Sequence, residues 1–179
     1  MVNNVDIALE AFKEAQKRFY KELNAFIELC EEKGKNTVVL SEDIGAFTAM
    51  REMIIWAVSL YDRIEKQRVS EEDKAFMSGI KYIDNVLKHE KEIFELFSIL
   101  SPGIKISVDV EDNQNGPIIR DVQMESQLVW GDLKGIRVNP KFEKQRDNFF
   151  NYVKKLEITK SIEKLDMIIE KYYSNMMEE

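Results

Sequence analysis

The sequence contains very little cysteine or histidine, with one residue of each among its 179 residues. The single cysteine, Cys30, excludes an internal disulfide and any metal site built from Cys-x-x-Cys pairs. The single histidine, His89, excludes metal sites built from histidine pairs, including the ferritin-like site that needs Glu-x-x-His on facing helices. We therefore expect no cofactor. Cys30 falls on the apolar side of a predicted helix, which favours packing over reactivity.

Long apolar runs and nucleotide-binding motifs are also missing. No apolar stretch approaches the ~20 residues of a membrane-spanning helix, and the amino terminus lacks the basic and apolar regions of a signal peptide. The sequence also lacks glycine-rich phosphate loops and nucleophile elbows, the usual markers of many enzyme classes. We expect a cytoplasmic protein with no membrane partner.

Basic residues are outnumbered, with 26 lysines and arginines against 33 aspartates and glutamates and a net charge of −7. Because phosphate contacts need a positive surface, this balance disfavours nucleic acid as a partner. It favours an acidic interaction protein, of the immunity or inhibitor type, that binds a basic protein.

Three long segments, 4–33, 41–68 and 70–100, repeat apolar residues every three or four positions, which predicts three amphipathic helices. In the third, Ser70 is a predicted N-cap before an acidic first turn, and Ser101-Pro102-Gly103 is a predicted end. This third helix is expected to be the centre of the bundle. Its apolar side consists of Phe76, Gly79, Ile80, Ile83, Val86, Leu87, Phe94 and Phe97.

The spacing then changes to strict alternation, with a segment rich in turn formers at 112–117. This pattern predicts a β-hairpin over about residues 104–130. A two-stranded hairpin is marginally stable alone, so its apolar face is expected on the helices or on a second copy of the protein. Trp130 is read either as a core residue or, with Val122 and Met124, as part of an exposed apolar patch for a partner.

Asn139-Pro140 predicts the start of a last helical region, which is expected to break near 158–161. The predicted fold is mainly α, a bundle of four or five helices with an inserted β-hairpin (about residues 104–130). We expect a single domain over 1–179 and a homodimer.

The edge of the third helix carries the most suggestive polar residues. His89 lies at the border of the apolar stripe, and Asn85 precedes it by one helical turn, so its amide could orient the imidazole. His89 is therefore either a packed boundary histidine or a general base in a groove or dimer cleft.

The stretch from Gly79 to His89 resembles the motif of HEPN-like helical proteins, in which arginine, a polar residue and histidine lie on one helix after an aromatic residue. On this resemblance the site comprises Tyr82, Asp84, Asn85 and His89. Asn85 and His89 match, whereas Asp84 occupies the position of the arginine. By the 100° helical step, Lys81, Lys88 and Lys91 lie on other sides of the helix and do not replace it.

The resemblance implies a helical bundle that dimerises with its motifs over a cleft, similar to a bacterial branch of that group. Active members are metal-independent ribonucleases, and others bind or regulate without cutting. Because an aspartate would repel the phosphate that arginine holds, we expect a non-catalytic binding or regulatory protein of bacterial or phage origin, acting in defence, stress or toxin-antitoxin systems. The alternatives are the acidic interaction protein and a metal-independent ribonuclease.

Overall fold

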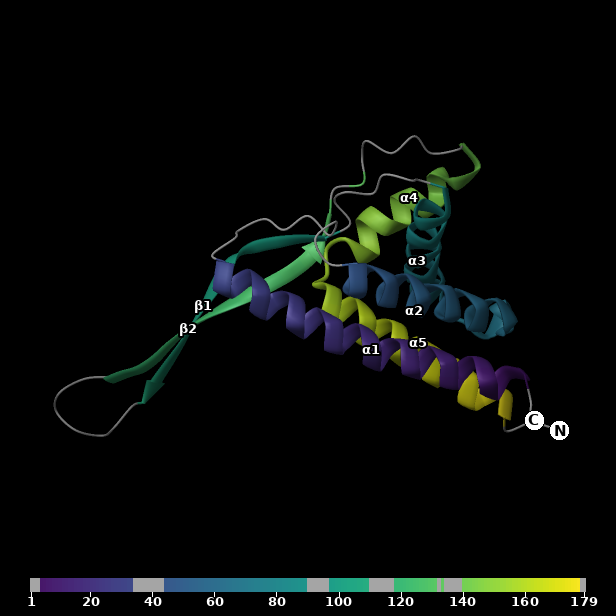
Figure 1. The fold of residues 1–179 in the computed structure, drawn as a ribbon. Helices are drawn as coiled ribbons and strands as arrows, with labels where there is room; N and C mark the ends of the chain where they lie inside the picture. The colour runs from purple at the N-terminus through teal and green to yellow at the C-terminus, as the bar shows by residue number, and fades with distance from the viewer. Residues whose placement is uncertain are drawn as a thin grey trace.

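The computed structural model describes residues 4–33, 44–89, 97–109, 118–131, 133 and 140–177. Within these residues the protein is mainly helical, as expected, with five α-helices and two strands (Figure 1). The elements are α1 (Asn4–Lys33), α2 (Ile44–Arg63), the 3-10 helix η2 (Lys66–Arg68), α3 (Glu71–His89), β1 (Phe97–Asp109), β2 (Ile118–Trp130), the 3-10 helix η4 (Pro140–Phe142), α4 (Glu143–Asn148), the π-helix η5 (Phe149–Val153) and α5 (Ile158–Met177).

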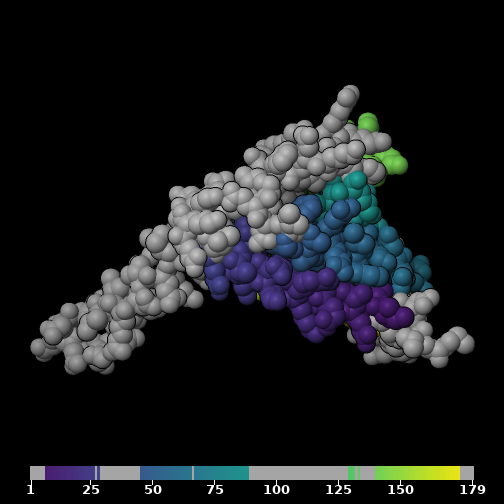
Figure 2. All heavy atoms as spheres, viewed as in Figure 1, coloured from purple at the N-terminus to yellow at the C-terminus, as the bar shows by residue number. Residues whose placement is uncertain are grey.

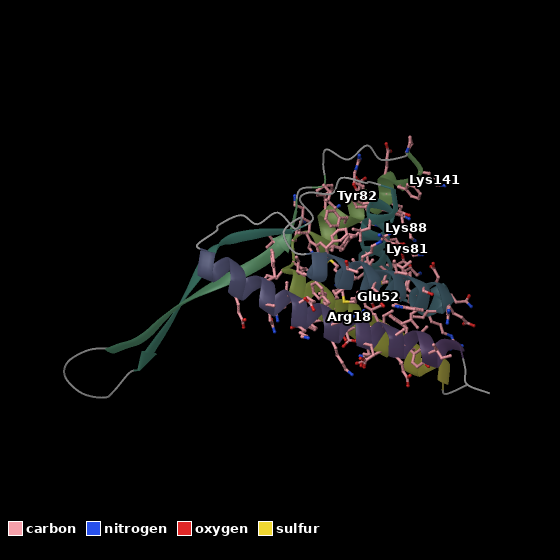
Figure 3. All side chains as sticks on the ribbon, viewed as in Figure 1. Arg18, Glu52, Lys81, Tyr82, Lys88 and Lys141 are labelled. Atoms are coloured by element: carbon pink, nitrogen blue, oxygen red, sulfur yellow. The ribbon has the colours of Figure 1, made fainter. Side chains whose placement is uncertain are left out.

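Helices α1 and α2 pack against each other along much of their length, and their side chains meet without a gap in the space-filling view (Figure 2). The helical spacing of α1 places a row of its apolar residues on one buried side, as predicted. Arg18 of α1 and Glu52 of α2 form an ion pair of 2.8 Å at the edge of this contact (Figure 3). The buried residues of α1 are Ala8, Phe12, Ala15, Phe19, Leu23 and Phe26. The side chain of Cys30 lies outside the described residues.

Helix α3 begins as the sequence predicts, with the Ser70 hydroxyl accepting a 3.2 Å hydrogen bond from the backbone N–H of Asp73. Its apolar side is buried through Phe76, Ile80 and Ile83, each at most 1% exposed. The predicted end at residue 100 is wrong, however. The helix ends at His89, residues 90–96 lie outside the described residues, and Phe97 already belongs to β1.

Strands β1 and β2 form a two-stranded antiparallel sheet in which Phe97 pairs with Trp130 and Asp109 with Ile118. The predicted start of the first strand at residue 104 is therefore wrong by seven residues. The prediction failed because Ser101-Pro102-Gly103 was read as a helix end, whereas the register shifts between Leu100 and Gly103, inside the strand. A β-bulge accommodates proline, which lacks the N–H that a regular ladder needs.

The last helical region is interrupted as expected, but the break lies at residues 154–157, just before the predicted 158–161, which form the first turn of α5. A 3-10 turn leads into α4 and η5, and α5 starts at Ile158 after a short turn. Helix α4 and η5 pack on α3, and α5 lies beside α1 and contacts α2 and β2 (Figure 1).

Buried residues from α1, α2, α3, η5 and α5 form one hydrophobic cluster that also includes Trp130 and Leu133. Each helix that the structure describes is too short or too polar to cross a lipid bilayer. The cluster contains most of the apolar stripe predicted for α3 up to Leu87, and α3 contacts both α2 and α4.

Candidate functional site

The motif positions of α3 lie where this helix packs on α4 and η5. Asn85 donates a 2.8 Å hydrogen bond from Nδ2 to Oε1 of Gln145 on α4. Both side chains are half-buried. The amide of Asn85 thus joins α3 to α4 through a residue that lies 60 positions further along the chain. The predicted role of orienting the His89 imidazole is not tested, because the side chain of His89 lies outside the described residues.

Asp84, at the arginine position of the motif, is buried in the bundle. Its side chain is 6% exposed and its Oδ2 lies 2.6 Å from Nζ of Lys88, one helical turn further on. Among the described residues, no donor lies at hydrogen-bond distance from the second oxygen, Oδ1, which is also buried. The ion pair with Lys88 therefore stabilises the carboxylate of Asp84, since a buried charge without a partner is strongly disfavoured.

Lys88 was expected on another side of the helix, and the structure corrects this expectation. A spacing of four residues brings two helical side chains onto the same face. The side chain of Lys88 is 47% exposed, so its aliphatic part leads from the buried Asp84 to the surface. Lys81 instead pairs with Asp62 of α2 and lies 5.4 Å from the ring centre of Tyr61 (Figure 3).

Tyr82 points into an aromatic cluster at the centre of the contact between α3 and η5. Its ring centre is 5.5 Å from that of Phe149, which in turn lies 6.3 Å from Trp130 and 5.2 Å from Phe150. Tyr82 is 1% exposed and Phe149 is fully buried. The aromatic residue ahead of the motif is therefore a core residue, and it connects α3 to the base of the sheet.

Gly79 allows this close approach. A Cβ atom at this position would lie 2.7 Å from Cγ2 of Val153 and 2.9 Å from Cα of Phe149. The second contact is with backbone, which side-chain rotation cannot relieve. Glycine is thus required where α3 meets the π-helix, whose wider turn is closed by a 2.8 Å bond from the Lys154 N–H to the Phe149 carbonyl.

Trp130 is a core residue, and the alternative of an exposed patch containing it is wrong for this structure. It is 3% exposed, and its indole N–H donates a 2.9 Å hydrogen bond to the hydroxyl of Ser161, which is also buried. Val122 and Met124 lie in β2 opposite Ile106 and Ile104, and their side chains lie outside the described residues. Trp130 is the residue that fixes the sheet to α5.

A second polar cluster joins the start of α3 to α5. The hydroxyl of Tyr172 donates a 2.8 Å hydrogen bond to Asp73 and accepts a 3.0 Å bond from the backbone N–H of Ser70. Burial disfavours the charged form of Asp73, but its hydrogen bonds with Tyr172, Ser70 and Lys171 outweigh this effect and lower its pKa. Nearby, burial and the charges of Asp62 and Asp73 raise the pKa of Tyr61 to about 12.

Sequence reasoning missed Gln145 and Ser161, the partners of Asn85 and Trp130. The neighbouring sequence does not reveal the role of either residue, because each forms its hydrogen bond with a residue far away in the chain. The pair of Asp84 and Lys88 could have been found, since its spacing of four is a standard helical ion pair. Among the described residues, no group of three or more histidine, cysteine or acidic side chains could hold a metal ion.

Comparison with known proteins adds no assignment: no family model, curated protein or solved structure matches the chain.

Proposed function

We propose that this protein is a non-catalytic binding or regulatory protein built on a HEPN-like helical bundle. The observation that carries the proposal is the state of Asp84, which is buried and paired with Lys88 at the place where the motif has arginine. A catalytic arginine must reach the scissile phosphate, whereas this carboxylate points into the protein and would repel phosphate.

The neighbouring motif positions support the same proposal. Tyr82 is packed on Phe149, and Asn85 is bonded to Gln145. These side chains stabilise the contact of α3 with α4 and η5, so the motif helix is a structural element. Binding is then assigned to the sheet, the part of the described chain that extends farthest from the helices (Figure 1).

The sheet is proposed to be a β-hairpin, with residues 110–117 as its turn. This segment, Val110-Glu111-Asp112-Asn113-Gln114-Asn115-Gly116-Pro117, is dense in residues that favour turns. The antiparallel pairing of Asp109 with Ile118 sets the two ends of the segment side by side, which suits a short connection.

The test is incubation of the purified protein with single-stranded RNA, with and without Mg²⁺. We expect the same small RNA degradation from wild type and from His89→Ala, prepared identically, at the level of contaminating nuclease. RNA cleavage by wild type that is lost in His89→Ala would contradict the proposal and favour the ribonuclease alternative.

A second variant tests the role of Asp84 directly. Asp84→Arg restores the arginine of the motif, but it places a guanidinium next to Lys88 in a buried position. We expect this variant to lose stability and to gain no RNA cleavage. A stable Asp84→Arg protein that cleaves RNA would show that the site is a catalytic one that has lost a single residue.

A further inference from the structure

Asp84 is a buried carboxylate that can accept more hydrogen bonds than the described residues donate to it. Its side chain is 6% exposed, and it lies one helical turn from Ile80 and from Leu87, which are both buried. Lys88 bonds to Oδ2, while no donor from the described residues reaches the buried Oδ1. Because buried carboxylates are normally stabilised by several hydrogen bonds, Oδ1 of Asp84 is suited to a further donor.

Lys88 is a partner that can leave Asp84. Its side chain is 47% exposed, and it lies one turn further along the same helix (Figure 3). A change of rotamer moves the ammonium group into water and returns conformational freedom to a long side chain. The Asp84 carboxylate then needs another cation, since a buried charge without a partner is strongly disfavoured. The pair is therefore suited to the exchange of one cation for another.

A guanidinium group fits this carboxylate better than an ammonium group does. Its N–H donors form a planar fork that bonds to both oxygens of a carboxylate at once, whereas the ammonium of Lys88 bonds to Oδ2 alone. A guanidinium group would thus supply the donor that Oδ1 lacks among the described residues. The long side chain of arginine can follow the path along which the stem of Lys88 runs from the surface to Asp84.

We propose that Asp84 is the anchor for an arginine side chain of a basic partner protein, and that Lys88 occupies this site in the free protein. The proposal rests on the proposed function for the premise that the protein binds a partner, and it adds a contact on α3 to the one assigned to the sheet. The net charge of −7 attracts a basic partner. The exchange keeps Asp84 paired and adds a hydrogen bond, which favours arginine over Lys88.

The experiment measures the binding of propylguanidinium, the side chain of arginine without its backbone, by calorimetry and by the melting temperature of the full chain. Lys88→Ala removes the resident ammonium group and opens the path to Asp84. We expect this variant to bind with a dissociation constant of about 1–10 mM and to melt about 2–5 °C higher at about 20 mM ligand. Butylammonium should bind more weakly, and tetramethylammonium, which has no N–H donor, should not bind.

The matched control is Asp84→Asn in the Lys88→Ala background, because the amide keeps the shape of the carboxylate without its charge. This double variant should neither bind propylguanidinium nor gain stability from it. A folded Lys88→Ala protein that does not bind propylguanidinium would overturn the proposal. Equal binding by the double variant, or equal binding of tetramethylammonium, would also overturn it. Circular dichroism checks that the variants keep their helices.

Wild type gives a second readout that does not depend on the folding of a variant. Propylguanidinium at Asp84 releases Lys88, so acetylation of Lys88 by an N-hydroxysuccinimide ester should become at least about twofold faster at about 50 mM ligand. Mass spectrometry measures the rate, and Lys74 is the internal control, because its partner Glu71 is exposed. An unchanged rate at Lys88, or equal acceleration at both lysines, contradicts the exchange. These outcomes are independent of RNA cleavage, so failure of this proposal and failure of the proposed function are distinguishable.

Discussion

Gly79 lies in close contact with η5, and its replacement tests this contact. In the middle of an ordinary helix, Gly→Ala stabilises by up to about 1 kcal/mol. At Gly79 the new Cβ would lie 2.9 Å from the Cα of Phe149, so α3 and η5 must move apart. We expect Gly79→Ala to lower the free energy of unfolding by about 1–3 kcal/mol, measured by urea denaturation.

Ser78→Ala is the control for this prediction, since Ser78 precedes Gly79 on α3 and is only partly buried. It should leave the stability within about 0.5 kcal/mol of wild type, or raise it slightly. A Gly79→Ala protein more stable than wild type would show that η5 yields readily to α3.

The pair of Asp84 and Lys88 predicts an asymmetric mutational result. Lys88→Met keeps the aliphatic stem and leaves the Asp84 carboxylate buried without its described partner. We expect a loss of about 1–3 kcal/mol at pH 7, of which Asp84→Asn in the same chain recovers at least half, because the buried charge is gone. Urea denaturation of the four proteins of the cycle measures both values. Additive losses would contradict a direct interaction between the two side chains.

At the scale of elements, the hydrogen bond from Trp130 to Ser161 fixes the sheet to α5. Ser161→Ala removes the acceptor and leaves a buried indole N–H, which costs about 1–3 kcal/mol. We expect the backbone amides of β2 near Trp130 to exchange faster with deuterium, while those of α1 change only through global stability. Unchanged exchange in β2 would mean that packing on Phe149 alone holds the sheet.

The junction of α3 with α5 predicts a pH dependence. Since the pKa of Asp73 is lower in the folded protein than its ordinary value, its stabilising contribution is present above about pH 4 and is lost as the pH falls. Asp73→Asn should therefore be less stable than wild type at pH 7 by about 1–2 kcal/mol, with a difference that shrinks towards pH 3.

Urea denaturation from pH 3 to pH 7 measures this difference. Tyr172→Phe, which removes the hydroxyl that donates to Asp73, should show a smaller pH effect than wild type. Stability curves of wild type and Asp73→Asn that stay parallel down to pH 3 would count against the assignment.

The elements also show how far sequence reasoning reaches. The bounds of α1 follow from local spacing, because apolar residues recur at helical intervals along the segment and those from Ala8 to Phe26 are buried. The end of β2 at Trp130 follows from the alternation of apolar and polar residues. The end of α3 does not follow, since Phe97 continues the helical spacing and Ser101-Pro102-Gly103 can end a helix or form a bulge. The pairing of Phe97 with Trp130 shows that this segment is a strand with a bulge, and Trp130 lies 33 residues further along the chain.

The candidate site was predictable only in part for the same reason. Tyr82, Asp84 and Asn85 were identified on one helix, but a helix pattern does not give the element that packs on it. Asn85 meets Gln145 and Tyr82 meets Phe149 through the contact of α3 with α4 and η5. Gly79, which sets the distance of this contact, looked like one more member of an apolar stripe.

At the scale of the whole molecule, ion pairs between α1 and α5 link the first and the last helix of the described chain. Lys13 of α1 lies 2.6 Å from Asp166 and 2.6 Å from Glu170 of α5. Burial disfavours the charged form of Lys13, but its bonds to both carboxylates outweigh this effect and raise its pKa. Lys13 thus links α1 to two carboxylates on α5, whereas an ion pair within one helix links only residues that are close in sequence.

Lys13→Ala therefore tests the closure of the bundle, and Lys17→Ala is its matched control, because Lys17 pairs with Glu14 inside α1. We expect Lys13→Ala to lower the free energy of unfolding by about 0.5–1 kcal/mol at low salt and Lys17→Ala to have a smaller effect. Since these side chains are partly exposed, 1 M NaCl should remove most of the difference between the two variants. Urea denaturation at both salt concentrations measures it, and a loss in Lys13→Ala that persists in 1 M NaCl would assign the effect to packing of the lysine stem between α1 and α5.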